Sequence, residues 1–293
     1  MNDLIVARQW YADELRYIAH IRSSRIVQAF STVPREHFLG SGPWQIVSPD
    51  PYQDYWTTED ADPKHLYHNV LVAIDAARHL NNGQPSLWAH LFQTLAINEG
   101  ERVLHIGCGT GYYTALLAEI VGQAGQVTAI EYDQAIAQRA HENLADRAQI
   151  EVIYGDGCLY HADNIDVIIV NAGVTHPQSR WLDALTSSGR LLIPLTNDQG
   201  GGGYLKVQRM AEGYKARFVS PVGIFQCASG RDSALADQLK EAFAAGYRHA
   251  QTTVNSLRRD AHEPDGTCWL HGEDFCLSSR LITESNNQIR IEK

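Results

Sequence analysis

The chain has 293 residues, of which 44% are hydrophobic and 20% are charged, and its formal net charge is −10. This length and composition are typical of a globular protein with a substantial buried core, and they exclude a disordered tail, a collagen and a coiled coil. The excess of acidic side chains argues against a protein that wraps nucleic acid, because phosphate binding requires a concentrated basic face.

The cysteines and the N-terminal sequence both bear on the compartment of the protein. The five cysteines, an odd number, are Cys108, Cys158, Cys227, Cys268 and Cys276. Scattered cysteines without a signal peptide are typical of reduced thiols rather than of a disulfide framework. The N-terminal residues hold no continuous apolar segment of the kind that a signal peptide needs. No apolar run approaches the ~18 residues of a membrane span. We therefore expect a cytoplasmic protein without membrane attachment.

The first third of the chain predicts helices around a long irregular connection. Apolar side chains recur at helical spacing within residues 1–40, which predicts a helix there. Residues 41–65 are rich in Pro, Asp, Tyr and Trp and predict an irregular connection. Two apolar stretches follow at 66–80 and 85–97. The second predicts a helix, because proline at its first position suits the first helical turn.

From residue 100 the pattern changes to predicted strands that alternate with amphipathic helices. The strands are 102–106, 126–131, 150–154, 166–171 and 190–195. The helices between them are 112–121, 134–145 and 178–186. This alternation predicts parallel strands that are joined by crossover helices.

The last third predicts a hairpin and a short tail. Residues 198–203 are rich in glycine and predict a flexible loop. Residues 204–209 and 216–225 then predict two strands of a hairpin. The tail from about 228 carries one more predicted helix, at 233–245.

A glycine-rich motif follows the first predicted strand. It contains Gly107, Gly109, Thr110 and Gly111, and a helix is predicted from Tyr112. Glycines at a strand-to-helix turn allow the backbone to approach a ligand closely, and the N-terminus of the helix adds partial positive charge. We interpret these five residues as part of a cofactor site. A tight turn without a ligand is the alternative.

Acidic residues at the ends of the next two strands extend this site. Glu131 ends the second strand about twenty residues after the glycines, where an acid suits the hydroxyls of a ribose. Asp156, which Gly157 follows, ends the third strand and is able to accept from the amine of adenine. The glycine spacing departs from the G-x-G-x-x-G of dinucleotide sites and favours S-adenosylmethionine. We add Tyr132 to the predicted cofactor site.

The fourth strand ends where the reacting groups of such folds lie. Asn171 is at this position, and we assign it to the cofactor site. Thr175 and His176 follow it and are candidates for the acceptor pocket, with ordinary loop capping as the alternative. Methylases of amide or aromatic amine nitrogens usually carry Pro-Pro-aromatic here. Its absence disfavours a nitrogen methylase that acts on adenine or glutamine.

Several segments in the same order resemble the protein-L-isoaspartate O-methyltransferase family, over roughly residues 26–225. They are AFSTVPREHF at 29–38, GQP at 83–85, the glycine motif within 103–118, GDG at 155–157, RLLIP at 190–194 and FVSPV at 218–222. The resemblance implies a class I methyltransferase, a Rossmann-like α/β fold with a mostly parallel seven-stranded sheet. It implies a helical N-terminal cap with the substrate loop at 1–97, an S-adenosylmethionine-binding methyltransferase domain at 98–227 and a C-terminal extension at 228–293.

The resemblance also implies transfer of a methyl group from S-adenosylmethionine to a carboxylate of a protein or peptide. A carboxylate is already anionic at neutral pH, so we assign no catalytic acid or base. Substrate binding falls on the segment that resembles the Ser-Gln-Pro loop of the family, in which glycine replaces the serine. These predicted substrate-binding residues are Gly83, Gln84, Pro85 and Ser86. His105 replaces an acid of the family two residues before the motif, and we include it in the cofactor site, with a histidine packed at the end of the strand as the alternative.

Two other functions stay open. One is an enzyme of the same fold with a different acceptor, such as a modified peptide or a small metabolite. The other is a non-catalytic protein that binds S-adenosylmethionine.

The tail also contains residue types that bind metals. They are Cys268, His271 and Cys276, with His262 nearby. The spacing C-x-x-H-x-x-x-x-C differs from standard zinc patterns, which have a second pair of ligands. We therefore expect no metal site and interpret the segment as a packed terminal strand.

Overall fold

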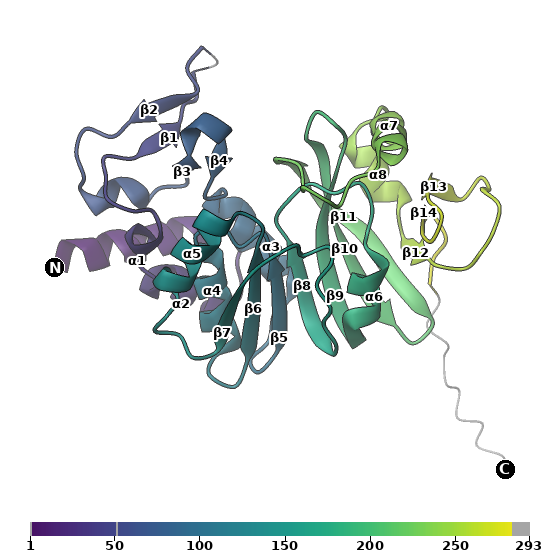
Figure 1. Cartoon of the computed structure of the whole chain (residues 1–293), viewed down its shortest axis with the longest axis horizontal. Coiled ribbons are helices and arrows are strands. Elements are labelled where there is room, and N and C mark those ends of the chain that lie inside the picture. Colours follow the sequence, from purple (N-terminus) through teal and green to yellow (C-terminus); the bar gives the residue numbers. More distant parts are fainter. Residues whose placement is uncertain (1, 51, 283–293) are drawn as a thin grey trace.

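A computed structural model describes residues 2–50 and 52–282 of the chain. Its centre is a single ten-stranded sheet with the strand order β13-β14-β12-β11-β10-β9-β8-β5-β6-β7 (Figure 1). Five neighbouring strands at one end are parallel. They are β7 (Ile150–Tyr154), β6 (Gln126–Glu131), β5 (Arg102–Ile106), β8 (Ile165–Val170) and β9 (Leu185–Thr196). The predicted alternation of strands and helices is confirmed for this half of the sheet.

The other half of the sheet is antiparallel. Its strands are β10 (Gly201–Met210), β11 (Gly213–Gly223), β12 (Ser256–Arg258), β13 (Cys268–His271) and β14 (Cys276–Ser278). The expected class of fold is correct, but the expectation of seven mostly parallel strands is wrong. The reason is that the C-terminal extension contributes β12, β13 and β14 beyond β11 (Figure 1). Residues 283–293 of the predicted extension lie outside the described residues.

Helices cover both faces of the sheet, and the alternation of side chains along each strand divides the core accordingly. Val103 packs into the cluster beneath α3 (Pro85–Leu95) and α4 (Tyr112–Val121), whereas its neighbour Leu104 packs into the cluster on the opposite face. α5 (Gln134–Asn143) packs on β6 and β7, while α6 (Ser179–Ala184), α7 (Ser233–Ala242) and α8 (Tyr247–Thr253) bury their apolar residues in the second cluster. Among the described residues, no helix combines the length and apolarity needed to cross a membrane.

The N-terminal region is less uniformly helical than expected. The predicted helix at 1–40 is two α-helices and a 3-10 helix, α1 (Asn2–Ile18), α2 (Ser24–Thr32) and η1 (Arg35–Phe38). The break follows from the left-handed backbone of His20 (φ 52°) and from Ser23, whose side chain caps α2 by accepting from the Ile26 N–H. α1 and α2 pack over α3, and α2 also contacts α4.

The predicted irregular connection contains regular structure. It forms the hairpin β1 (Gln45–Val47) and β2 (Tyr55–Thr57), followed by the 3-10 helix η2 (Pro63–Leu66). The apolar stretch at 66–80 continues into β3 (Ala73–Asp75), η3 (Ala76–Arg78) and β4 (Leu80–Asn81). Because these strands have only two or three residues each, their sequences carry too little periodicity to distinguish them from loops.

Two predictions in the last third also require correction. The glycine run is not entirely a loop, because Gly201, Gly202 and Gly203 pair with β9 or β11 as the start of β10. A Cβ on Gly202 would overlap the Leu195 carbonyl oxygen, so glycine permits close approach here. The described part of the tail contains two helices, α7 and α8, where one was predicted.

Candidate active site

A cavity of about 670 Å³ lies at the carboxyl ends of the parallel strands. Parallel strands end at the same edge of the sheet, so residues at the ends of four neighbouring strands lie side by side along the cavity. Asn171 follows β8, Gly107 follows β5, Glu131 ends β6 and Asp156 follows β7. This edge is where open α/β sheets bind ligands, and the volume is in the range of small-molecule sites.

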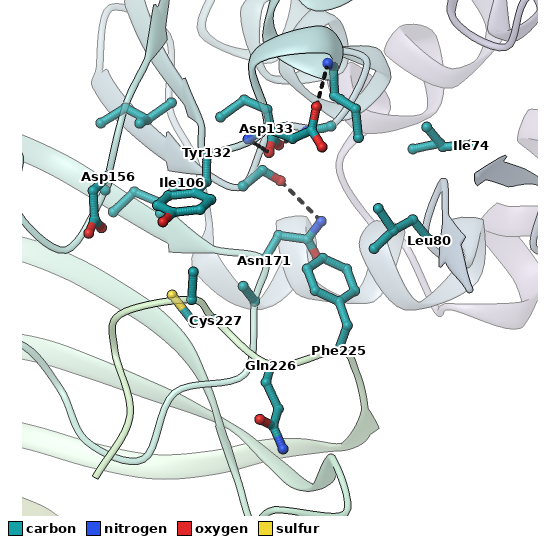
Figure 2. A pocket seen from close by; sticks show the side chains of 18 of the residues that line it. Ile74, Leu80, Ile106, Tyr132, Asp133, Asp156, Asn171, Phe225, Gln226 and Cys227 are labelled. Carbon is teal, nitrogen blue, oxygen red and sulfur yellow. Dashed lines mark hydrogen bonds between the residues drawn. The ribbon is translucent and has the colours of Figure 1, made fainter. Parts of the chain in front are cut away.

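The glycine motif brings backbone to the wall of this cavity. Gly107 and Gly109 line it, and both have positive φ values, of 76° and 58°. A Cβ on Gly107 would lie 3.2 Å from the Asn171 carbonyl oxygen, so this position favours glycine through both its backbone and its packing. The Asn171 side-chain amide in turn donates to the Gly107 carbonyl at 3.3 Å (Figure 2).

Glu131 is fixed at the cavity wall by two backbone hydrogen bonds. Its Oε2 accepts from the Gly109 N–H at 2.8 Å, and its Oε1 accepts from the Asp133 N–H at 3.0 Å. Each carboxylate oxygen has two lone pairs, so both keep one acceptor site for a ligand. Tyr132 also lines the cavity and is 59% exposed.

Asp156 occupies the corresponding place after β7. Its Oδ1 accepts from the Cys158 N–H at 2.8 Å and from the Ser229 hydroxyl at 2.7 Å. These two bonds orient the carboxyl group beside Gly157, which also lines the cavity. A Cβ on Gly157 would overlap the Ile106 side chain, so this position of the cavity wall favours glycine.

The segment after β11 forms another wall that the sequence patterns did not reveal. Phe225, Gln226 and Cys227 line the cavity (Figure 2). Gly173 holds this segment, because its N–H donates to the Phe225 carbonyl and its own carbonyl accepts from the Cys227 N–H, both at 2.9 Å. Arg231 adds a hydrogen bond to the same Gly173 carbonyl at 3.0 Å. No local periodicity marks such a wall, since it depends on contacts between distant segments.

The N-terminal region supplies the remaining wall. Ile74 and Leu80, from β3 and β4, line the cavity (Figure 2). Arg78 donates through Nη1 to Asp133 Oδ2 at 2.6 Å and through Nε to Asp75 at 2.8 Å. Asp133 also caps the N-terminus of α5. Its position immediately before a helical pattern predicts this cap, but the sequence does not predict the ion pair with Arg78.

Four predicted cofactor residues lie outside the cavity. Thr110, Gly111 and Tyr112 are absent from its lining, and the Thr110 and Tyr112 side chains are buried in the core. His105 is buried as well, because alternation along β5 directs it to the face opposite Ile106, where its Nδ1 lies 2.9 Å from Thr114 Oγ1. Burial lowers the pKa of His105 to about 3, so the ring is neutral. We therefore correct its assignment from cofactor contact to core residue.

A second cavity of about 400 Å³ adjoins the first. Asn81, Asn171 and Phe225 line both cavities. Gly83 and Gln84, two of the predicted substrate-binding residues, line the second one. Of the residues that the structure describes, no Asp, Glu, Lys or Arg lines it.

The position where the family has serine is filled by an aromatic ring instead. A Cβ on Gly83 would overlap Trp88 Nε1 and would lie 3.1 Å from the Tyr113 ring. The Trp88 and Tyr113 rings stack with centroids 4.2 Å apart, and the Tyr113 hydroxyl donates to the Gly83 carbonyl at 3.0 Å. The Trp88 indole thus packs where a side chain at position 83 would lie.

The other predicted substrate residues lie outside the linings of both cavities. Pro85 is buried at the start of α3, and the Ser86 N–H donates to Asn69 Oδ1 at 2.9 Å. Thr175 is also buried, and its Oγ1 accepts from the Asp232 N–H at 2.9 Å. His176 stacks with Phe275, with ring centroids 6.2 Å apart. Thr175 and His176 therefore anchor the C-terminal extension, and their assignment to the acceptor pocket is corrected.

The parallel strands, the glycine turn after β5 and the acidic residues after β6 and β7 define a class I methyltransferase fold. The comparison with protein families specifies the class further. The model of the protein-L-isoaspartate(D-aspartate) O-methyltransferase family matches residues 8–220, and the chain belongs to this family.

Individual relatives agree with this membership. A protein-L-isoaspartate O-methyltransferase of Thermotoga maritima is 31% identical over 59% of this chain and 51% of its own length. One of Leptothrix cholodnii is 38% identical over 52% of this chain and 58% of its own length. The chain thus spans little more than half the length of these relatives. A solved structure of a protein-L-isoaspartate O-methyltransferase shares the fold, with a TM-score of 0.63 and 23% identity over 79% of this chain and 69% of that chain.

Proposed function

We propose that the protein is an S-adenosylmethionine-dependent O-methyltransferase that methylates a carboxylate of a protein or peptide, with an isoaspartyl residue as the first candidate. The observation that carries the proposal is the junction of the two cavities. One contains the acidic residues suited to a nucleoside, the other contains the loop that matches the family's substrate loop, and they share Asn81, Asn171 and Phe225.

The residues of the first cavity fit S-adenosylmethionine. The carboxylate of Glu131 would accept from the ribose hydroxyls, and Asp156 beside Gly157 would accept from the adenine amine. Gly107 and Gly109 would admit the methionine portion against the backbone of the motif. Asp156 uses Oδ1 for its own fold contacts, and no hydrogen bond of the described chain uses its Oδ2. When bound there, S-adenosylmethionine supplies an electrophilic methyl group on its sulfonium.

The second cavity fits an acceptor that needs no deprotonation. A carboxylate is anionic at neutral pH, and the absence of Asp and Glu from the cavity lining avoids repulsion between like charges. Gln84 is exposed at this cavity and its amide is suited to donate to the acceptor. Catalysis would then depend on orientation of the two reactants and on exclusion of water by the walls.

One observation favours a second candidate function, methylation of another acceptor by the same fold. The Trp88 indole occupies the space that the serine side chain of the family would need at Gly83. An apolar ring there changes the shape and hydrogen-bonding capacity of the acceptor cavity. A modified peptide or a small metabolite is the alternative acceptor.

The test is methyl transfer from radiolabelled S-adenosylmethionine to an isoaspartyl peptide and to its aspartyl twin. We expect base-labile label on the isoaspartyl peptide alone. Intact binding of S-adenosylhomocysteine without label on either peptide would favour the second candidate. Absence of both binding and label would contradict the proposed cofactor site.

Matched variants separate cofactor binding from acceptor binding in this assay. Glu131→Gln and Asp156→Asn keep the size of the side chains and should weaken S-adenosylhomocysteine binding. Gln84→Ala should leave that binding unchanged and reduce transfer through a higher KM for the peptide. If Gln84→Ala instead weakens the binding of S-adenosylhomocysteine, the two cavities are wrongly assigned.

A further inference from the structure

The C-terminal extension contains a cluster of four residues of metal-binding types. The cluster consists of His262, Cys268, His271 and Cys276, and their nearest nitrogen and sulfur atoms all lie within 4.8 Å of one another. It is remote in sequence from the candidate active site, and it lies beyond residue 220, where the match to the family ends. It therefore does not follow from family membership.

The backbone of the β13–β14 hairpin explains how three of these residues meet. His271 pairs with Cys276 across the two strands, so their side chains share a face. Cys268 would point to the opposite face from His271 in a regular strand, because the two are three positions apart. A bulge between Cys268 and Leu270 inserts one residue, and Cys268 consequently pairs with Ser278, on the same face as Cys276.

The fourth residue comes from the loop that connects β12 with β13. His262 Nδ1 lies 2.8 Å from the Asp260 carbonyl oxygen, which requires Nδ1 to carry the proton. In the neutral ring Nε2 is then the nitrogen with a free lone pair, and it lies 3.5 Å from Cys268 Sγ. A histidine that donates one ring N–H to a carbonyl and presents the other nitrogen is oriented as zinc-binding histidines are.

Among the described residues, one ring nitrogen of the cluster has no hydrogen-bond partner. His271 Nδ1 is buried and has no hydrogen-bond partner, although His271 packs edge-on against the His262 ring at a centroid distance of 4.8 Å. Cys276 is completely buried. Arg258 pairs with Cys276 across β12 and β14. Its buried Nη1 has no hydrogen-bond partner within the described part of the chain and lies 3.7 Å from Asp265 Oδ2. An unpaired ring nitrogen is unfavourable in a buried place unless a ligand occupies it.

We propose that these four residues bind a structural zinc ion. Two thiolates and two imidazoles are a common tetrahedral ligand set for zinc, and four protein ligands leave no open position for catalysis. Tetrahedral Zn–S and Zn–N bonds of about 2.3 and 2.1 Å place ligand atoms about 3.4–3.8 Å apart, so the widest pair needs to approach by about 1 Å. Binding releases the protons of Cys268 and Cys276, and the two thiolates balance the charge of the ion.

The surroundings of the cysteines suit thiolates. The Asp265 N–H donates to Cys268 Sγ at 3.4 Å, and Arg258 is the cross-strand partner of Cys276 in β12, which places a positive charge beside this thiol. Such bonds to the sulfur atoms stabilise a zinc site. The ion would fasten the 259–267 loop to β13 and β14, strands of only four and three residues that contribute little by themselves. The expectation of no metal rested on sequence spacing, which reveals neither the bulge nor the loop that brings His262 to the hairpin.

The first experiment measures metals in the full-length chain, which is expressed in zinc-containing medium and purified without chelator. We expect about one zinc per chain by inductively coupled plasma mass spectrometry. After removal of zinc, Co²⁺ should bind and give a thiolate-to-cobalt charge-transfer band together with intense visible bands of tetrahedral cobalt. This spectrum is recorded on the unaltered chain, so it does not depend on whether a variant folds.

Variants then assign the ligands. Cys268→Ser and His262→Ala should lose most of the zinc and the cobalt bands, whereas Cys227→Ser and His249→Ala should keep both. Two results would overturn the proposal. One is a chain that carries no zinc and gives no tetrahedral cobalt spectrum, including one that is isolated with a Cys268–Cys276 disulfide. The other is equal metal content in the ligand variants and the controls. The proposal is independent of methyl transfer, so neither result bears on the proposed function.

Discussion

Ser229 donates a hydrogen bond of 2.7 Å to Asp156, and this contact joins the C-terminal part of the chain to the end of β7. Asp156 therefore does not take its orientation from its own strand alone. The extension after β11 and the strand that carries the proposed adenine contact are coupled through one carboxylate oxygen. The other oxygen faces no competing hydrogen bond within the described chain.

The first prediction uses this coupling. Asp156→Ala should weaken S-adenosylhomocysteine binding about ten-fold or more, because hydrogen bonds to charged groups contribute about 1.5–3 kcal/mol. Ser229→Ala should weaken it less, since the Cys158 N–H still orients the carboxylate. Isothermal titration calorimetry provides the measurement, with the exposed Ser187→Ala as control. Equal affinity of Asp156→Ala and the control would remove Asp156 from the site.

The second prediction concerns the wall that the N-terminal region contributes. Arg78→Ala removes the ion pair with Asp133, so β3 and β4 are less firmly held. The affinity for S-adenosylhomocysteine should fall several-fold because the ligand dissociates faster. Asp133→Asn keeps an acceptor for the α5 cap and should have a similar effect. Stopped-flow dissociation rates measure this, with the exposed Arg22→Ala as control. If the double variant binds S-adenosylhomocysteine no more weakly than either single variant, Arg78 and Asp133 act through their contact. Losses of binding free energy that add fully in the double variant would contradict this explanation.

The third prediction concerns restoration of the family serine. Gly83→Ser should destabilise the fold by about 1–3 kcal/mol, because the new Cβ overlaps the Trp88 ring in a well-packed region. The positive φ of 56° adds to the cost. Chemical denaturation measures it. Two control variants separate backbone strain from steric overlap. Gly100 has a positive φ of 80° but no atom within 4 Å of a new Cβ, so Gly100→Ser tests strain alone. Gly266 has neither a positive φ nor a close neighbour, so Gly266→Ser is the control for both.

Stability of Gly83→Ser equal to that of Gly266→Ser would contradict the packing at Trp88. A loss equal to that of Gly100→Ser would assign the whole effect to backbone strain. Replacement of Trp88 by a smaller apolar residue in the Gly83→Ser background should recover part of the lost stability if the overlap is the cause.

The fourth prediction follows from the burial of His105. Its pKa in the folded protein is about 3, below the ordinary value of 6.5, so protons bind preferentially to the unfolded chain between these values. The free energy of unfolding should therefore fall as the pH decreases below about 6.5, with a contribution from this residue of up to about 1.4 kcal/mol per pH unit. His105→Asn should show a shallower slope in denaturation curves than the unaltered chain. The exposed His161→Asn should not, and equal slopes in all three would contradict the shifted pKa.

The sequence predicts the parallel half of the sheet well because its signals are local. A strand, a glycine turn and an amphipathic helix recur along the chain, and Gly107, Glu131 and Asp156 each sit at a strand end that this pattern predicts. The alternation of side chains along β5 is enough to exclude His105 from the predicted cofactor site. It places residue 105 on the face opposite Ile106, in the core beneath α4.

The remaining parts of the site depend on contacts between distant segments. Phe225 reaches the cavity because Gly173 holds its backbone, and Arg78 reaches it through Asp133. Neither pair has a local pattern in the sequence. The same is true of Trp88, whose position explains Gly83 only once the fold brings the indole onto the loop.

The continuity of the sheet has a consequence for shortened versions of this protein. β11 is an eleven-residue strand, and β12 joins it by backbone pairing at Tyr214 and Lys215. A chain that stops near the end of the family match would present β11 as an open sheet edge. Open edges invite pairing with other chains. In the described chain β12 covers this edge at Tyr214 and Lys215, and we expect the shortened chain to form oligomers or aggregates even where its cofactor cavity is complete.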